Sequence, residues 1–459
     1  MIKIAKNKVI RGFSYFFEVF IMKLYEASYR FDSPKLSAHL LLILIKPLNR
    51  DKKYRVLCLG RSQFYDDVRA LIKYGKNIHY MYFHKLILGR IVRHMIPFDL
   101  DLSLLKKYTN QEIVQDTPIT EHGITYHIDP KYSKGKKKVY NYFSKMFPIL
   151  HKKLKFDAVM SGNFIYVDQQ EFFRVCEENN IPCIILNKEG IGGKNMPKEG
   201  LWSSSGCRFI GSKVLFMNEP MMKHDVKYVN DLHEKKAIIV GQPRFDHYTR
   251  SRKRYLKQVV LFAFNIEEYV TGLMTGSMAK KLNELADNFH KNVIEFAIKY
   301  PDYRVVIKTK TAEKFLNYPK NIYKKYFNQI KLNNLIITNK MRVEDLILNS
   351  RVILGFNTTA LVEALVACKV IISPDFSAVL SQKIIGTFNK YEDLLNCTSG
   401  YNEMEEIILN YKNYNSDNIH RKNQFLEPLI FKNDGKASQR AESEIIKTIE
   451  KRRSNINLL

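Results

Sequence analysis

Short hydrophobic runs alternate with longer amphipathic stretches along most of the chain. The runs have four to seven residues and are bounded by Gly, Pro, Asn or charged residues. This pattern is typical of strands that are buried on both faces of a parallel sheet. The first half holds five such runs: Tyr54–Gly60, Ile78–Phe83, Phe156–Met160, Pro182–Leu186 and Lys213–Met217. The second half holds six: Ala237–Val240, Gln258–Phe264, Arg304–Lys308, Asn334–Thr338, Arg351–Leu354 and Lys369–Ser373.

Helical patterns such as Ala279–Tyr300 and Thr359–Cys368 lie between these runs. Alternation of strand and helix predicts an α/β fold with two Rossmann-like domains that face each other across a cleft. We place the break near residues 225–256, where two charged segments look exposed. The predicted parts are an N-terminal segment (1–48), a first domain (49–232), a second domain (233–436) and a C-terminal helix (437–459). That helix either covers the second sheet or crosses back to the first domain.

The charge of the chain is strongly positive. Its 459 residues include 74 Lys and Arg but only 46 Asp and Glu, a net charge of +28. Such an excess indicates a polyanionic partner. Nucleic acid, an anionic membrane and a phosphorylated substrate are the three candidates. A bias in base composition explains the same excess without any partner. Six scattered cysteines form no C-x-x-C pair, which fits a reducing cytoplasm and excludes a zinc or disulfide framework.

The N-terminal segment resembles neither a signal peptide nor a membrane span. The apolar run His39–Ile45 is much shorter than the roughly 20 residues that a spanning helix needs. Residues 1–30 mix Lys and Arg with Phe, Ile, Tyr and Leu, as in a basic amphipathic helix. Such a helix either rests on an anionic leaflet or packs on the first domain, and the sequence leaves both interpretations open.

The strongest chemical signal lies within Arg351–Asp375, which reads as strand, polar turn, helix and strand. Asn357 and Thr358 stand where a helix N-cap belongs, and Thr359 opens the first turn. Backbone N–H groups at such a turn bind anions when it follows a parallel strand. Glu363, one turn further on, is placed to bind ribose hydroxyls. The alternative is an ordinary capped helix with an exposed glutamate.

A second signal is the segment Ala237–Asp246, in which a strand ends in Gly-Gln-Pro. Gly241 opens a tight turn that aims Arg244 and Asp246 away from the edge of the sheet. An arginine in this place suits bidentate contact with a phosphate. The alternative is a surface ion pair between Arg244 and Asp246.

These motifs together resemble a known family. Gly-x-Pro-Arg-Phe-Asp, a basic linker, and later Asn-Thr-Thr-Ala-Leu-Val-Glu-Ala-Leu with Lys-Val-Ile are similar to bacterial surface-carbohydrate and capsule glycosyltransferases of GT-B fold. The broader kin are CDP-glycerol glycerophosphotransferases and capsular Kdo transferases. The similarity is clearest over residues 182–376. It implies a nucleotide-activated donor on the second domain, with phosphate at Asn357–Thr359 and ribose near Glu363.

The resemblance has one departure. The family carries Lys-x-His-Pro or a similar motif at the end of a strand in the second domain, where this chain reads Val306–Glu313. Lys308 and Lys310 supply positive charge, but the histidine and proline are absent.

The catalytic base is expected at the end of another strand. In the similar proteins a strand end with Lys-Glu or His-Glu faces the cleft, and here Lys188, Glu189 and Gly190 hold that position. Glu189 is the predicted base, which takes the proton of a sugar hydroxyl, and Asp66 is the second candidate. Lys188 and Gly190, with Arg61 after the first strand, are the predicted acceptor-side residues. A Lys188–Glu189 surface pair in a glycine turn is the alternative.

Other motifs are absent. The chain has no P-loop, no G-x-S-x-G and no H-E-x-x-H, and Asp99-Leu-Asp101 is a short D-x-D outside any strand end. We therefore expect no bound metal and no cofactor besides a nucleotide-sugar co-substrate.

The leading prediction is a cytoplasmic glycosyltransferase, peripheral on the inner face of an anionic cell membrane. It would move a sugar to a lipid-linked or growing surface polysaccharide.

A CDP-polyol phosphotransferase needs the same phosphate site and is the nearest alternative. A sugar-nucleotide 2-epimerase shares the two-domain shape, but its acidic residue pattern is not seen. A degenerate, scaffold-like transferase is a further alternative. A basic nucleic-acid-binding protein is favoured only by charge and aromatic content, because no RRM, KH or helix-turn-helix signature is present, and nucleic acid is not expected as a partner.

Overall fold

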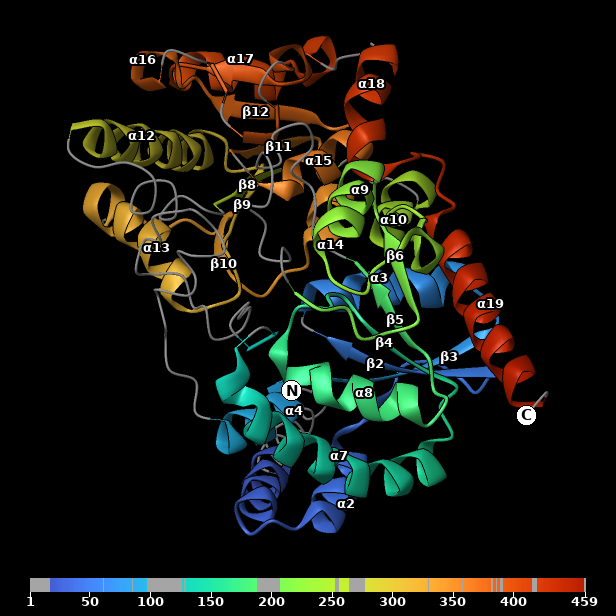
Figure 1. Ribbon diagram of the computed structural model, residues 1–459. Helices are drawn as coiled ribbons and strands as arrows, with labels where there is room; N and C mark the ends of the chain where they lie inside the picture. The colour runs from blue at the N-terminus through green and yellow to red at the C-terminus, as the bar shows by residue number, and fades with distance from the viewer. Residues whose placement is uncertain are drawn as a thin grey trace. The chain divides into compact units, whose positions relative to one another are not determined.

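The computed structural model shows two compact units, which divide the chain at 244–245 and again at 436–437 (Figure 1). It describes residues 17–60, 62–84, 86–96, 126–127, 129–187, 207–251, 256–263, 277–328, 330–356, 358–380, 383–384, 386–388, 391–414 and 419–457.

The first unit is built on a sheet of seven strands in the order β1-β3-β2-β4-β5-β6-β7. All neighbours are parallel except β1, which pairs antiparallel with β3. The strands are β1 (Lys46–Pro47), β2 (Tyr54–Gly60), β3 (Ile78–His84), β4 (Ala158–Ser161), β5 (Cys183–Leu186), β6 (Lys213–Phe216) and β7 (Ala237–Ile239). Its helices include residues 17–30, α2 (Pro34–Leu44), α3 (Ser62–Tyr74), α4 (Leu86–Met95), α7 (Ser133–Leu154), α8 (Gln170–Glu178), α9 (Glu219–Tyr228) and α19 (Ala437–Asn457).

The second unit is built on a sheet of six parallel strands in the order β10-β9-β8-β11-β12-β13. The strands are β8 (Gln258–Phe262), β9 (Arg304–Lys308), β10 (Leu335–Thr338), β11 (Val352–Gly355), β12 (Val370–Pro374) and β13 (Asn396–Thr398). Its helices include α10 (Asp246–Arg250), α12 (Ser277–Lys299), α13 (Lys314–Phe327), α14 (Val343–Asn349), α15 (Thr359–Val366), α16 (Ser377–Leu380), α17 (Tyr401–Leu409) and α18 (Ile419–Ile430).

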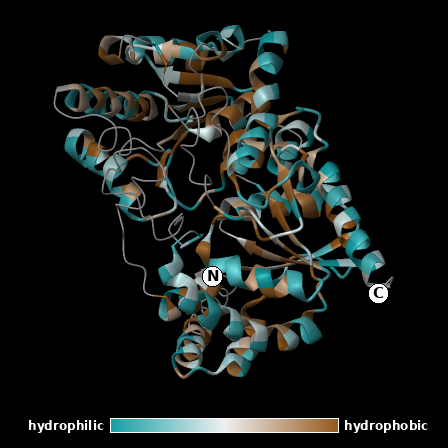
Figure 2. Cartoon of the chain, in the orientation of Figure 1, coloured by the Kyte–Doolittle hydropathy of each residue, from teal (hydrophilic) through white to brown (hydrophobic). Residues whose placement is uncertain are grey.

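Hydrophobic burial explains why these segments become strands. The strands of both sheets are mostly coloured as hydrophobic, whereas the helices are mixed (Figure 2). In the second unit the apolar face of α12 repeats at helical spacing through Phe289, Val293 and Phe296, and it packs on β8, β9, β11 and β12. Burying a side chain of this size contributes about 1.5–3 kcal/mol.

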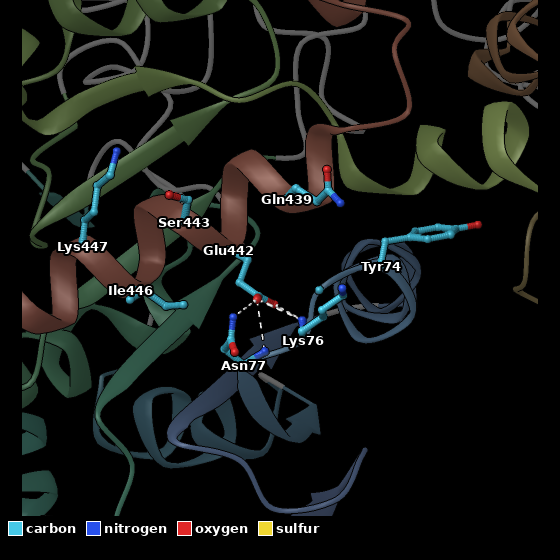
Figure 3. A pocket seen from close by; sticks show the side chains of 9 residues that line it. Tyr74, Lys76, Asn77, Gln439, Glu442, Ser443, Ile446 and Lys447 are labelled. Atoms are coloured by element: carbon cyan, nitrogen blue, oxygen red, sulfur yellow. Dashed lines mark hydrogen bonds between the residues drawn. The ribbon is translucent and has the colours of Figure 1, made fainter.

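The C-terminal helix α19 belongs to the first unit. Its residues Ala441, Ile445 and Ile449 join the core that includes β2 and α3. Glu442 on the same helix accepts hydrogen bonds from the backbone N–H groups of Lys76 at 2.9 Å and Asn77 at 3.1 Å, beside a hollow of about 370 Å³ (Figure 3). Of the two places that the sequence left open for this helix, the structure selects the first domain.

The fold prediction is confirmed for its strands. All eleven predicted runs contain a strand, and both units are Rossmann-like sheets with helical crossovers. The strands β1 and β13 were not predicted, because they are only two and three residues long. No described helix is long and apolar enough to cross a membrane.

The expected boundary at 232–233 differs from the observed one at 244–245. The strand β7 lies after the predicted boundary but pairs with β6, so it completes the first sheet. The charged residues before it form a short 3-10 turn, Glu234–Lys236, within the first unit. The charged segment Glu234–Lys236 is therefore a turn within the first unit. The division between the two units falls further along the chain, at 244–245.

Candidate functional site

The carboxyl edge of the second sheet has a point where the strand order reverses. From β8 the chain adds β9 and β10 on one side, and then β11, β12 and β13 on the other. Ligands of open α/β sheets bind at such a point, outside the carboxyl ends of the strands. Phe262 at the end of β8 is in register with Lys308 of β9 and with Gly355 of β11. Two segments that were singled out separately in the sequence therefore lie at the same edge.

The turn after β11 has the local structure that was predicted. Thr358 is the N-cap of α15, with extended backbone angles, and its side chain accepts a hydrogen bond from the N–H of Ala360 at 3.4 Å. Thr359 is exposed at the first helical position, whereas the rest of α15 is buried. A Cβ at Gly355 would lie 3.1 Å from the carbonyl oxygen of Phe262, so this residue permits the close approach of β11 to β8. Asn357 lies outside the described residues.

Lys308 is held as a buried cation at this edge. Its ammonium group donates to the carbonyl oxygens of Thr309 at 2.5 Å and Asn339 at 3.1 Å. Burial lowers the pKa of Lys308 from 10.5 to about 8, because desolvation disfavours the charged form. The residue can therefore change its charge within an accessible pH range.

Glu363 differs from one of the two interpretations of the sequence. It is buried, and Oε2 accepts a hydrogen bond of 2.5 Å from the hydroxyl of Tyr248 on α10. The alternative of an exposed glutamate is wrong, because α15 is buried almost throughout its length. The carboxylate instead connects α15 to α10 within the second unit.

Gly241 and Arg244 belong to the first unit, although the predicted boundary assigned them to the second domain. Gly241 has a φ of 82°, which confirms the tight turn after β7 and suits glycine. The backbone N–H and Nη1 of Arg244 both donate to the carboxylate of Asp67, each at 3.1 Å. Asp67 on α3 is fully buried and was not identified from the sequence.

The predicted acid–base and acceptor residues are mostly outside the described residues. These are Arg61, Lys188, Glu189 and Gly190. The second candidate base, Asp66, lies in α3, the helix that follows β2, with a side chain that is 48% exposed and 3.9 Å from Arg69. Its role as a base stays a prediction.

Four carboxamides at the same edge were missed. Each stands one to three residues after a strand and is buried: Asn163 after β4, Asn187 after β5, Asn218 after β6 and Gln242 after β7. Asn218 caps α9 by accepting from the N–H of Met221 at 3.0 Å. Neither side-chain polar atom of Gln242 has a hydrogen bond to the described residues. Carboxamides donate and accept, as a hydroxyl-rich ligand requires, and their spacing after the strands was a signal available in the sequence.

Metal binding finds no support in the described part of the chain. No group of three His, Cys, Asp or Glu residues there is placed to hold a metal ion. Asp99 and Asp101 lie outside the described residues.

Comparisons with known proteins give distant likenesses only. No family model and no curated protein matches this chain. Among solved structures, UDP-GlcNAc 2-epimerase from Neisseria meningitidis bound to UDP-GlcNAc is 14% identical, with a TM-score of 0.44, over 87% of this chain and 100% of that one. The 2-epimerase from Methanocaldococcus jannaschii has 14% identity and a TM-score of 0.44 over 86% and 99%. The glycotransferase of kitacinnamycin has 10% identity and a TM-score of 0.39 over 87% and 100%. These likenesses are too distant to indicate what this chain does.

Proposed function

We propose that this protein is a glycosyltransferase that moves a sugar from a nucleotide-activated donor to a lipid-linked or growing cell-surface polysaccharide. The observation that supports the proposal is that Lys308, at the end of β9, and the Thr358–Thr359 helix start, after β11, lie at the same edge of the second sheet on either side of β8. Both features favour an anion, and a nucleotide sugar carries its charge on the phosphates.

In the proposed complex the phosphates of the donor contact the first-turn N–H groups of α15, including that of Thr359, with Asn357 beside them. Lys308 neutralises the charge that develops on the leaving nucleotide. Glu363 stays on the ribose side, with Oε2 held by Tyr248. Arg244 is proposed to contact a donor phosphate, as the sequence predicted, and Asp67 orients its guanidinium. No metal ion is part of the proposal.

On the acceptor side, Glu189 is the proposed base, with Asp66 as the second candidate. The base takes the proton of an acceptor hydroxyl while the hydroxyl oxygen bonds to the anomeric carbon and the nucleotide leaves with the electron pair of the broken bond. Arg61, Lys188 and Gly190 are the proposed acceptor contacts.

The test begins with nucleotide binding. Thermal shifts of the purified chain are measured with CMP, CDP, UDP, GDP and dTDP, because a ligand that binds the folded state raises the melting temperature. Thr359→Pro removes one first-turn N–H, and proline is tolerated at the first helical position. Thr359→Ala keeps that N–H and is the matched control. We expect a shift that is reduced in Thr359→Pro and Lys308→Met and retained in Thr359→Ala.

Turnover separates the related functions. Radiolabelled donors of the nucleotide that binds are incubated with and without membrane acceptor. Transfer of sugar to the acceptor supports the proposal, whereas transfer of a polyol phosphate from a CDP donor would identify the phosphotransferase. Conversion of a UDP-sugar without acceptor would identify an epimerase. Binding to RNA or DNA without any nucleotide shift would overturn the proposal.

A further inference from the structure

Exposed hydrophobic side chains are concentrated near the N-terminus of the described chain. Among the described residues, thirteen large hydrophobic residues are exposed, and seven of them lie in the range from Phe17 to Ile43. The other six are spread over residues 256–419. More than half of these residues therefore belong to helix 17–30, α2 and the turn between them.

The exposed residues of helix 17–30 form a stripe. Phe17, Phe20 and Leu24 are three and four residues apart, so they lie on one side of the helix. They are 52%, 52% and 39% exposed, and Phe31 in the following turn is 84% exposed. Leu36 and Ile43 are seven residues, or two helical turns, apart on α2, with 48% and 52% exposed. Single exposed apolar residues are common, but a stripe of aromatic residues marks an interaction surface.

A chain of buried hydroxyl groups holds these two helices against α7. The hydroxyl oxygens of Ser28 and Ser37 are 2.5 Å apart, and those of Ser37 and Tyr142 are 2.6 Å apart. Ser28 also donates to the carbonyl oxygen of Tyr25 at 2.7 Å. These three hydroxyl-bearing side chains are buried, whereas Phe17, Phe20 and Phe31 are exposed.

Helix α7 adds a stripe of positive charge to the same three-helix cluster. Lys134, Lys138, Lys145 and Lys152 lie at helical spacing on one side and are exposed. The helix contains seven lysines and no Asp or Glu. Within the described residues none of the four stripe lysines forms an ion pair. Their charge is therefore available to an anionic partner.

We propose that helix 17–30, α2 and α7 form a docking surface for an anionic lipid bilayer. Phe17, Phe20 and Leu24 enter the boundary between headgroups and acyl chains, while the α7 lysines contact lipid phosphates. A second copy of this chain is the less suitable occupant, because a two-fold contact would bring two lysine stripes together. The proposal does not depend on the reaction proposed above.

The experiment is flotation of the full chain with vesicles of phosphatidylcholine alone and of an equimolar mixture with phosphatidylglycerol. We expect binding to the mixed vesicles only, and weaker binding at high salt, because salt screens the lysines. The apolar variant carries Phe17→Ser, Phe20→Ser and Leu24→Ser, and its partition coefficient should fall at least about tenfold. The lysine variant carries Lys134→Ala, Lys138→Ala, Lys145→Ala and Lys152→Ala, and it should lose on the order of a hundredfold.

Matched variants of the second unit are the controls. Leu256→Ser, Leu409→Ser and Ile419→Ser remove the same number of exposed hydrophobic residues, and Lys280→Ala, Lys281→Ala, Lys320→Ala and Lys324→Ala remove the same charge. Both controls should bind as the unchanged chain does. Should the apolar variant fold poorly, the surface lysine variant still provides the test.

Three results would overturn the proposal. They are a lack of binding to the mixed vesicles, an equal loss in the control variants, and a dimer that both test variants dissociate. Light scattering of the vesicle-free protein measures the last of these, and it would assign the surface to a second copy.

Discussion

The hydroxyl of Tyr248 donates a hydrogen bond of 2.5 Å to Oε2 of Glu363, and both side chains are buried. This contact joins α10, which follows the division between the units, to α15, whose first turn is the proposed phosphate site. A buried carboxylate is costly without hydrogen bonds, so the phenol stabilises the position of α15.

Tyr248→Phe should lower the free energy of unfolding of the second unit by about 2 kcal/mol, because a buried acceptor loses its partner. It should also weaken nucleotide binding through the displaced α15. Denaturant unfolding and the thermal-shift assay measure the two effects. Tyr414→Phe is the control, since Tyr414 donates at 2.6 Å to Glu406 on the surface, and it should cost less than about 0.5 kcal/mol. Equal costs in the two variants would contradict the prediction.

The pair of Arg244 and Asp67 gives a second prediction. Asp67 is fully buried and Arg244 nearly so, with side chains 0% and 12% exposed. Asp67→Ala should therefore destabilise the first unit by about 3 kcal/mol, because a buried guanidinium loses its counter-ion. A double-mutant cycle with Arg244→Ala measures the coupling energy. The exposed pair of Arg208 and Asp231 is the control and should couple by less than about 1 kcal/mol.

The same variants separate the two roles of Arg244. If the residue only supports the fold, Arg244→Lys should lower stability and turnover together. If it also contacts phosphate, turnover should fall further than stability explains, because lysine lacks the bidentate fork.

Lys308 predicts how nucleotide binding depends on pH. Its pKa in the folded protein, about 8, is below the ordinary value of 10.5. The ammonium is therefore charged below about pH 8 and becomes neutral above it, so affinity for a nucleotide diphosphate should fall as pH rises through this range. A bound anion favours the charged form and moves the midpoint upward. Titration calorimetry measures the effect at pH values up to about 1.5 units below and above the pKa of Lys308. Lys308→Met should bind the nucleotide weakly, and its affinity should not change with pH. A wild-type profile as flat as that of the variant would remove Lys308 from the site.

Burial of Lys308 also affects the stability of the ligand-free protein. Because its folded pKa is lowered, the unfolded chain binds more protons between about pH 8 and 10.5. The cost of burying the ammonium is therefore present below about pH 8 and diminishes as pH rises toward 10.5. Relative to Lys308→Met, the unchanged chain should gain stability over that interval in denaturant unfolding.

Glu442 predicts the contribution of the C-terminal helix to the first unit. Its carboxylate accepts from the backbone N–H groups of Lys76 and Asn77 and from the side-chain amide of Asn77 (Figure 3). Glu442→Ala should lower the free energy of unfolding by about 2 kcal/mol, because these partly buried donors lose a charged acceptor. Gln439→Ala, an exposed change on the same helix, should have little effect. Chemical denaturation followed by circular dichroism distinguishes them, and equal stability of the two variants would show that Glu442 does not anchor the helix.

The strands and the helix start at Thr358 could be predicted from the sequence because they depend on local patterns. A continuous apolar run such as Val352–Leu354 is stable only when both faces are buried, and a threonine before an apolar helix satisfies its first N–H groups. The turn at Gly241 was equally local, since it requires a backbone angle that glycine adopts easily. Composition and spacing also predicted an amphipathic N-terminal helix, of which residues 17–30 are helical.

Partners that are far apart along the chain were decided by the tertiary structure alone. Asp67 is 177 residues from Arg244, and Tyr248 is 115 residues from Glu363. No local pattern encodes such pairs, because they form only when sheet order brings two helices together. The same holds for β7, which joined the first sheet through its pairing with β6, and for α19, which the core around β2 and α3 holds in the first unit. The sequence determined which segments are strands and helices, whereas long-range pairing and burial decided which unit each one completes and which charged side chains are buried with a partner.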